Sequence, residues 1–326
     1  MILVYSGWGD VTSALADFPW IFVPFLLCLS LCNYALRFVK WDYYLRHMDI
    51  RIPRDQSLIV FLSGLVMVIS PGKIGELLKS VFLKQASGVP IARSFPIVIA
   101  ERLTDLIALV IISFAGIGLL ATGDYMILVV AAAILGSFVL AIGNRRFSLF
   151  VIGLVEKIPV VEKIGHRLHT AYDSMSALMR PGPLMIATTW SILAWLCECL
   201  GFYTVIHLFD GGANPLVAAF MYAFGTIAGV ISPGGLGITD GTMIAMMQNA
   251  KMMGGAPLSK GVAGAATMLV RMGTLWFAVV VGAVVLMRFQ SRFAGADLLL
   301  DKEEELEVDD ILDGEHEPPA AGPADA

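Results

Sequence analysis

The chain has 326 residues, of which 57% are apolar and 15% are charged, and its net charge is −5. A soluble globular domain averages about 45–50% apolar and about 25% charged residues. The composition therefore excludes an ordinary soluble domain. The low content of basic residues argues against nucleic-acid binding, and the sequence contains no nucleotide-binding loop, zinc-ligand pattern or Gly-x-Ser-x-Gly motif.

Five apolar runs are each long enough to cross the hydrocarbon core of a bilayer as a helix, which needs about 20 residues. They cover residues 20–38, 96–121, 125–143, 184–209 and 261–287. These runs predict an all-α integral membrane protein with about five full spans.

Two shorter apolar stretches, 58–70 and 215–231, each end in Ser-Pro-Gly, and a second short helix is predicted after each. A short apolar run that Pro-Gly interrupts is typical of a helix that enters the membrane and turns back. We therefore predict two helical hairpins, either re-entrant or fully spanning, which brings the total to between seven and nine hydrophobic segments.

Basic residues predict the orientation, because cytoplasmic loops are enriched in Lys and Arg. Residues 1–19 contain no basic residue, so we place the N-terminus outside. Five basic residues lie at and beyond the end of the first run, in a segment that we place in the cytoplasm: Arg37, Lys40, Arg46, Arg51 and Arg54. Residues 148–180 are amphipathic and are predicted to form a helix on the inner membrane surface.

The C-terminal segment, residues 297–326, carries twelve acids and one lysine. This composition cannot bury a core, so we predict an acidic, disordered, cytoplasmic tail. The remainder, residues 1–296, is predicted to be a single transmembrane domain with a positive net charge. The expected location is a bacterial or archaeal cytoplasmic membrane.

The chain contains an internal repeat. The segment Ile69-Ser-Pro-Gly-Lys-Ile-Gly-Glu76 aligns with Ile231-Ser-Pro-Gly-Gly-Leu-Gly-Ile238, and an arginine follows in each case, Arg102 and Arg271. Repeat one covers about 20–121 and repeat two about 184–288. An odd number of crossings separates their starts, so the second unit is predicted to be inverted relative to the first. Inverted repeats with broken helices that meet at mid-membrane are found in many secondary transporters, and we expect a mid-membrane pocket between the two hairpin tips.

Arg102 and Arg271 are the strongest candidates for function, because an arginine inside an apolar helix is costly and usually faces a cavity or a partner. Arg102 can reach Asp105 at i+3, and Glu101 lies on the same helix face. An internal ion pair that only locks helices together is the alternative. Arg271 has no acid within a turn, so it requires a distant carboxylate or binds an anion.

The glycine-rich hairpin tips are candidates for anion binding, because free N–H groups at a helix N-terminus attract phosphate. Glu76 and Asp240 follow the two tips and are predicted to neutralise a facing arginine or to accept a proton. Glu198 lies in the middle of an apolar run, either as a partner for an arginine or as a neutral acid bonded to a neighbouring helix. The full candidate site comprises Arg102, Arg271, Lys73, Glu76, Glu101, Asp105, Glu198, Asp240, Ser70, Gly72, Ser232, Gly234 and Gly235.

Three motifs in this order resemble the lysylphosphatidylglycerol synthase transmembrane family, also called the flippase-like domain family. They are Ser70-Pro-Gly-Lys-Ile-Gly-Glu76, Glu101-Arg-Leu-Thr-Asp105 and Pro233-Gly-Gly-Leu-Gly237. The resemblance covers residues 15–290 and implies movement of a charged-headgroup lipid across the membrane. The soluble aminoacyl transferase domain of the best-known members has no counterpart here, so synthase activity is not implied. The family commonly has a glutamate after the third motif, where this chain has the shorter Asp240.

The favoured hypothesis is a translocase, and not an enzyme, for an anionic or aminoacylated phospholipid or a lipid-linked intermediate. It requires no cofactor, metal or catalytic residue, and its partners are lipid, membrane and either a homo-oligomer or a lipid-modifying enzyme. The first alternative is a non-transporting membrane subunit of a glycosyltransferase or lipid-modifying enzyme. The second is an intramembrane enzyme that uses paired acids, for which no nucleophile stands out.

Overall fold

The computed structural model describes residues 7–70, 75–117, 165–230 and 232–289, with residues 129, 133, 136 and 137. All regular secondary structure in these ranges is helical, which confirms an all-α protein. The predicted span at 125–143 and the acidic tail lie wholly or mostly outside the described residues. The predicted surface helix is described only in its last part, as α10 (Gly165–Leu178).

Three helices among the described residues are long and apolar enough to cross a membrane: Trp20–His47, Pro181–Leu208 and Lys260–Phe289. The first combines η1 (Trp20–Phe22) with α3 (Val23–His47), and the second is α11 (Pro181–Leu208). A fourth long helix, α6 (Ile91–Ile117), carries charged residues at its centre. The chain is therefore a membrane protein.

The first helix is longer than the apolar run, and two basic residues assigned to the cytoplasmic segment lie within it. The helix continues through residue 38 to His47, and Arg37 and Lys40 are 5% and 0% exposed. The basic residues at the end of the apolar run therefore continue the helix, and the predicted cytoplasmic side of this segment stays a prediction. Carboxylates from other helices neutralise these charges, so the helix can remain in the protein interior.

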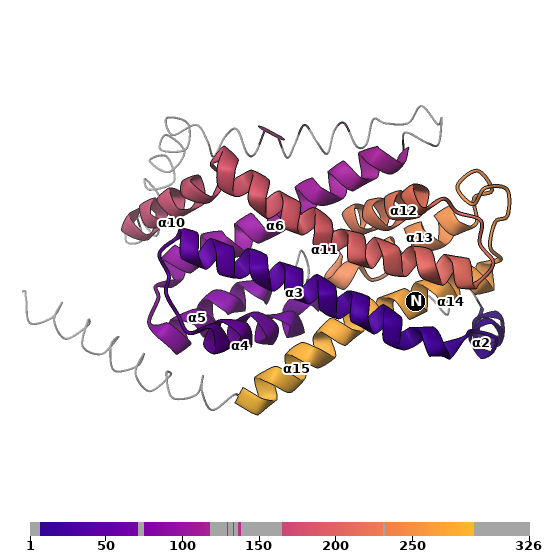
Figure 1. Ribbon diagram of the computed structural model, residues 1–326, viewed down its shortest axis with the longest axis horizontal. Coiled ribbons are helices and arrows are strands. Elements are labelled where there is room, and N and C mark those ends of the chain that lie inside the picture. The colour runs from indigo at the N-terminus through magenta and orange to yellow at the C-terminus, as the bar shows by residue number, and fades with distance from the viewer. Residues whose placement is uncertain are drawn as a thin grey trace, which may run out of the picture.

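Two helical hairpins lie at opposite ends of the molecule. The first consists of α4 (Arg54–Gly64), η2 (Leu65–Ile69) and α5 (Leu78–Ser87). The second consists of α12 (Pro215–Ala228), η4 (Pro233–Gly235) and α13 (Ile238–Met247). In Figure 1, α4 and α5 occupy the left half and α12 and α13 the right half, while α3 and α11 run along the length between them.

The turns of the two hairpins meet near the middle of the molecule, where η2 contacts η4. A Cβ atom at Gly234, whose φ is +58°, would lie 3.1 Å from the Ile69 side chain. Glycine is needed here because the backbone has a left-handed conformation and approaches the opposite turn closely.

The span after each hairpin packs against the other hairpin. Helix α6 packs on α12, and the last helix, α15 (Phe277–Phe289), packs on α4 and η2. Glycines allow both approaches: a Cβ at Gly116 would lie 2.3 Å from the Leu216 carbonyl oxygen, and one at Gly282 would lie 2.4 Å from the Val66 amide nitrogen. Small residues that let helices approach closely are typical of membrane interfaces.

The helix that carries Arg271 changes its geometry directly after this residue. Helix α14 (Lys260–Arg271) passes into a π-helical turn, η5 (Met272–Trp276), and then into α15. Ser30 and Tyr34 of α3 donate hydrogen bonds to the carbonyl oxygens of Gly273 and Thr274 in this turn, at 2.7 and 3.1 Å. Such turns occur frequently at functional sites.

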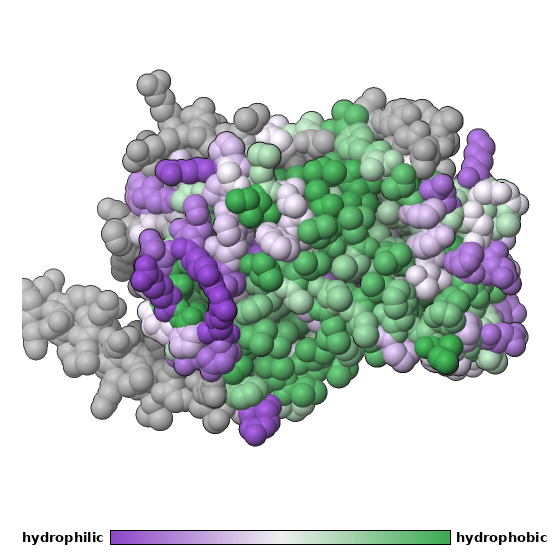
Figure 2. Space-filling view, viewed as in Figure 1, coloured by the Kyte–Doolittle hydropathy of each residue, from purple (hydrophilic) through white to green (hydrophobic). Residues whose placement is uncertain are grey.

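The surface has the polarity of a membrane-spanning body. Figure 2 shows a broad hydrophobic zone across the middle of the visible face, with hydrophilic residues gathered at its two ends. Large apolar side chains on the long helices remain exposed, among them Leu196 and Leu200 on α11 and Val280 and Val284 on α15. An exposed apolar surface of this extent is expected where the surroundings are lipid.

Candidate functional site

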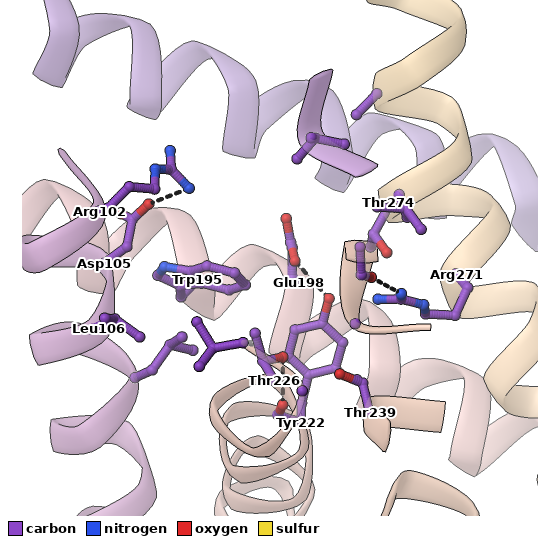
Figure 3. Close-up of a pocket in the computed structure, with 18 of the residues that line it drawn as sticks. Arg102, Asp105, Leu106, Trp195, Glu198, Tyr222, Thr226, Thr239, Arg271 and Thr274 are labelled. Carbon is purple, nitrogen blue, oxygen red and sulfur yellow. Dashed lines mark hydrogen bonds and ion pairs between the residues drawn. The ribbon is translucent and has the colours of Figure 1, made fainter. Parts of the chain in front are cut away.

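A cavity with about 140 Å³ of interior space lies where the two hairpin turns meet the long helices. Its wall contains three arginines, Arg37, Arg102 and Arg271, and two carboxylates, Asp105 and Glu198. The other polar and aromatic lining residues include Tyr34, Trp195, Tyr222, Thr226, Ser232, Thr239 and Thr274. Figure 3 shows Arg102 with Asp105 on one side, Arg271 on the other, and Glu198 with Tyr222 between them.

One side of the cavity is backed by seven charged side chains from α3, α6, α5 and the segment that leads into α5. We call this group the buried ion cluster: Arg37, Lys40, Glu76, Lys79, Glu101, Arg102 and Asp105. Lys40, Glu76, Lys79 and Glu101 have no exposed surface. Burial of charges is tolerated only when they are paired.

Two carboxylates hold the cluster together. Glu76 Oε2 lies 3.0 Å from Arg102, 3.2 Å from Lys79 and 3.7 Å from Arg37. Asp105 lies 2.7 Å from Lys40, 3.2 Å from Arg102 and 3.9 Å from Arg37. The predicted contacts of Arg102 with Asp105, and of Glu76 with an arginine, are therefore present.

Lys40 and Lys79 lie deeper than the arginines. Lys40 also donates to Ser191 of α11 at 2.8 Å, which links the cluster to the second half of the chain. Lys79 lies 3.1 Å from Glu101 and 4.8 Å from the ring centroid of Phe61. An aromatic face adds favourable electrostatics for a desolvated ammonium group.

Arg271 forms the opposite side of the cavity and has the distant acid that the sequence required. Its Nε lies 3.1 Å from Asp240, and its Nη2 donates to the Gly234 carbonyl oxygen at the hairpin tip. Asp240 in turn accepts a hydrogen bond from the Gly237 N–H at 3.0 Å. Arg271 is thereby held in place by the second hairpin.

Glu198 lies between the two sides. The hydroxyl group of Tyr222, on α12, donates a hydrogen bond to Glu198 Oε2 at 2.6 Å. The side chains of Trp195 and Tyr222 lie 6.4 Å apart, centroid to centroid, and flank this carboxylate (Figure 3). A carboxylate between aromatic rings has the chemistry to bind an ammonium group.

The structure places the predicted residues in different positions relative to the cavity. Those that line it are Arg102, Arg271, Asp105, Glu198, Ser232, Gly234 and Gly235. Glu76, Glu101 and Asp240 instead neutralise lining or neighbouring cations, and Ser70 accepts a hydrogen bond from Gly75 within its own turn. Gly72 and Lys73 lie outside the described residues.

Backbone N–H groups near the hairpin tips were predicted to bind an anion, and one described N–H near each tip is bonded within the protein. Ser70 Oγ accepts from the Gly75 N–H at 2.7 Å, and Asp240 accepts from the Gly237 N–H. Side chains of the protein therefore already bond these donors. The positive charge that faces the cavity comes from guanidinium groups.

Sequence reasoning missed Arg37, Lys40 and Lys79, and also Tyr34, Trp195 and Tyr222. The signal for the first two was present, because no helix-breaking residue separates the apolar run 20–38 from the segment up to His47. Tyr222 gave no local signal, since its role depends on the packing of α12 against α11.

Comparison with known proteins finds a matching family and two similar membrane proteins. The family described as "Lysylphosphatidylglycerol synthase TM region" matches residues 1–282. A UPF0104 membrane protein of Methanothermobacter thermautotrophicus is 21% identical over 320 residues, which cover 90% of each chain. Another UPF0104 membrane protein, from Pyrococcus horikoshii, is 22% identical over 324 residues, covering 88% of this chain and 94% of its own.

Proposed function

Because the chain belongs to the lysylphosphatidylglycerol synthase transmembrane family, we propose that it moves a lipid with a charged headgroup across the bilayer and catalyses no reaction. The expected substrate is an anionic or aminoacylated phospholipid or a lipid-linked intermediate. One observation carries the proposal: arginines from α3, α6 and α14 converge on a single cavity where the two hairpin turns meet.

The chemistry of the cavity suits such a headgroup. Guanidinium groups bind phosphate oxygens with paired N–H donors, and Arg102 and Arg271 hold this group from opposite sides. Asp105 and Glu198 balance the charge or bind an amine of the headgroup. Apolar lining residues, among them Leu106 and Leu109 of α6, provide a surface for the start of the lipid chain.

The architecture in this proposal is an inverted repeat with re-entrant hairpins. The order of helices supports it: α3, α4–α5 and α6 in the first unit correspond to α11, α12–α13 and α14–α15 in the second. In Figure 1, α3 runs from right to left and α11 from left to right, and the hairpins extend toward the centre from opposite ends. Rocking of two such units around a fixed site exposes the site alternately to each side.

In the proposed orientation the N-terminus lies outside a bacterial or archaeal cytoplasmic membrane and the C-terminus lies in the cytoplasm. The visible surface is hydrophilic at its two ends and hydrophobic in the middle (Figure 2). This distribution supports helices that cross the membrane along the long axis of the molecule.

The test is lipid movement in proteoliposomes that contain the full-length protein and a fluorescently labelled phosphatidylglycerol. A membrane-impermeant reductant bleaches label in the outer leaflet, so transport raises the fraction that is bleached. Arg271→Ala should reduce the initial rate at least about tenfold, because a charge-assisted contact contributes about 1.5–3 kcal/mol.

The matched control is Arg46→Ala, since Arg46 is 57% exposed and pairs only with its helix neighbour Asp42 among the described residues. It should transport at the wild-type rate. If the wild-type protein moves no lipid in this assay but co-purifies with a lipid-modifying enzyme, the subunit hypothesis replaces the proposal.

A further inference from the structure

Arg37 differs from the other two cavity arginines in how closely it is paired. Arg102 has carboxylate oxygens at 3.0 and 3.2 Å, and Arg271 has one at 3.1 Å. The ion-pair contacts of Arg37 measure 3.7 and 3.9 Å. Its side chain is 6% exposed, and its Nε and Nη2 atoms are buried without a hydrogen-bond acceptor among the described residues. Arg102 has the same two atoms without an acceptor, and Arg271 has its Nε, but both have a carboxylate oxygen within 3.2 Å.

A buried guanidinium with unused donors is costly, since each unsatisfied donor loses its bond to water. Nε and Nη2 are the two nitrogens whose N–H groups point in parallel and bind two oxygens of one phosphate. Arg37 lines the cavity, so these donors lie where a ligand can supply the missing acceptors.

The close ion pairs of the buried ion cluster do not depend on Arg37. Among its described members, four cations face three carboxylates: Glu76, Glu101 and Asp105. Without Arg37, each of these carboxylates still has a cation within 3.2 Å. Removal of Arg37 therefore breaks no ion pair shorter than 3.7 Å, and its guanidinium is available to an anion in the cavity.

We propose that Arg37 is the residue that binds the phosphate of the lipid headgroup in a two-pronged contact, and that Arg102 and Arg271 are secondary contacts held by their own carboxylates. This assignment rests on the proposed function, because it identifies the residue that recognises the same substrate. It also explains why a cation in the middle of α3 remains poorly paired.

The experiment measures binding separately from transport. Purified full-length protein in detergent is titrated with dihexanoyl phosphatidylglycerol, with dihexanoylglycerol, which lacks the phosphate, and with inorganic phosphate, while the midpoint of thermal unfolding is followed. The wild-type midpoint should rise with the phospholipid. It should rise little with the other two ligands.

Three variants distinguish the roles of Arg37. Arg37→Gln should keep the unliganded midpoint close to the wild-type value and raise the half-saturating phospholipid concentration at least about tenfold. Arg37→Lys keeps the charge but loses the paired donors, so it should give an intermediate, several-fold weakening. Arg46→Gln, on the exposed side of the same helix, should bind as wild type does.

Each contrary result has a separate meaning. If the phospholipid fails to stabilise the wild-type protein, the proposed function itself fails. If the wild-type protein binds it and both Arg37 variants bind equally well, only the assignment to Arg37 is overturned. If inorganic phosphate stabilises as strongly as the phospholipid, the site recognises a free anion, and the lipid headgroup is rejected as its ligand. Arg37→Lys keeps the test valid if the glutamine variant does not fold.

Discussion

At the scale of single residues, Glu76 is the counter-charge that three cations share. One of its oxygens lies within 3.7 Å of Arg37, Lys79 and Arg102, which belong to three different segments. The carboxylate is completely buried. Cations brought this close repel one another, so Glu76 makes their proximity possible.

Glu76→Gln should therefore lower the free energy of unfolding by about 3–5 kcal/mol, because it leaves buried cations without their shared counter-charge. The change preserves side-chain shape and removes only the negative charge. Thermal and denaturant unfolding of the purified protein in detergent measure the effect.

The control for this variant is Asp42→Asn. Asp42 pairs with Arg46 at 2.7 Å on the surface of α3, and exposed pairs of this kind contribute about 0.3–0.5 kcal/mol. Equal losses for the two variants would mean that the buried ion cluster contributes no more than a surface pair.

Sequence reasoning identified Arg102, Asp105 and Arg271 because a charge within a long apolar run stands out on its own. Arg37 and Lys40 follow the end of such a run, where basic residues usually mark a cytoplasmic loop. Only the carboxylates of Glu76 and Asp105, which approach from other segments, explain their burial. Such a signal is three-dimensional and has no counterpart in local sequence.

At the scale of elements, the two repeats are held together where α6 packs on the second hairpin and α15 packs on the first. Gly116 of α6 and Gly282 of α15 lie at these two contacts. Any Cβ atom there would meet the backbone of the partner element, which cannot move aside as a flexible side chain does.

Gly282→Ala should destabilise the protein by about 1–3 kcal/mol, the usual cost of overpacking. The added carbon would lie 2.4 Å from the Val66 amide nitrogen. Gly201→Ala on α11 is the matched control, since its Cβ would have only ordinary contacts, at 3.7 Å and beyond. A stabilising effect of Gly282→Ala would contradict the close packing of α15 on η2.

At the scale of the whole molecule, the repeated Ser-Pro-Gly motif predicted the two hairpins and their place in the order of helices. The element boundaries were less accurate, because capping contacts such as Ser70 with Gly75 become visible only after folding. The meeting of the two turns was suggested by the repeat, but the identity of the contacting atoms depends on the packing of α6 and α15.

The proposed inverted repeat predicts that Arg51, before the first hairpin, and Lys251, after the second, lie on opposite sides of the membrane. Both residues are exposed. In spheroplasts, a membrane-impermeant maleimide should label Lys251→Cys from outside and should label Arg51→Cys only after permeabilisation.

A background without Cys28, Cys32, Cys197 and Cys199 removes the natural thiols, and the same labelling after detergent solubilisation shows that each new thiol is reactive. Labelling of both positions from one side of the membrane would reject the inverted repeat.

The π-helical turn at Met272–Trp276 changes the direction in which residues after it point around the helix axis, relative to residues before it. Such a turn holds one residue more than an α-helical turn, and one residue corresponds to about 100° of rotation. In an uninterrupted α-helix, Arg271 and Gly282 would share nearly the same face, because eleven residues make about three full turns. The extra residue rotates them apart by roughly a quarter of a turn. One continuous helix can thus direct its arginine toward the cavity and its glycine toward η2. Deletion of a single residue within the turn should restore a regular α-helix and leave these two directions nearly unchanged.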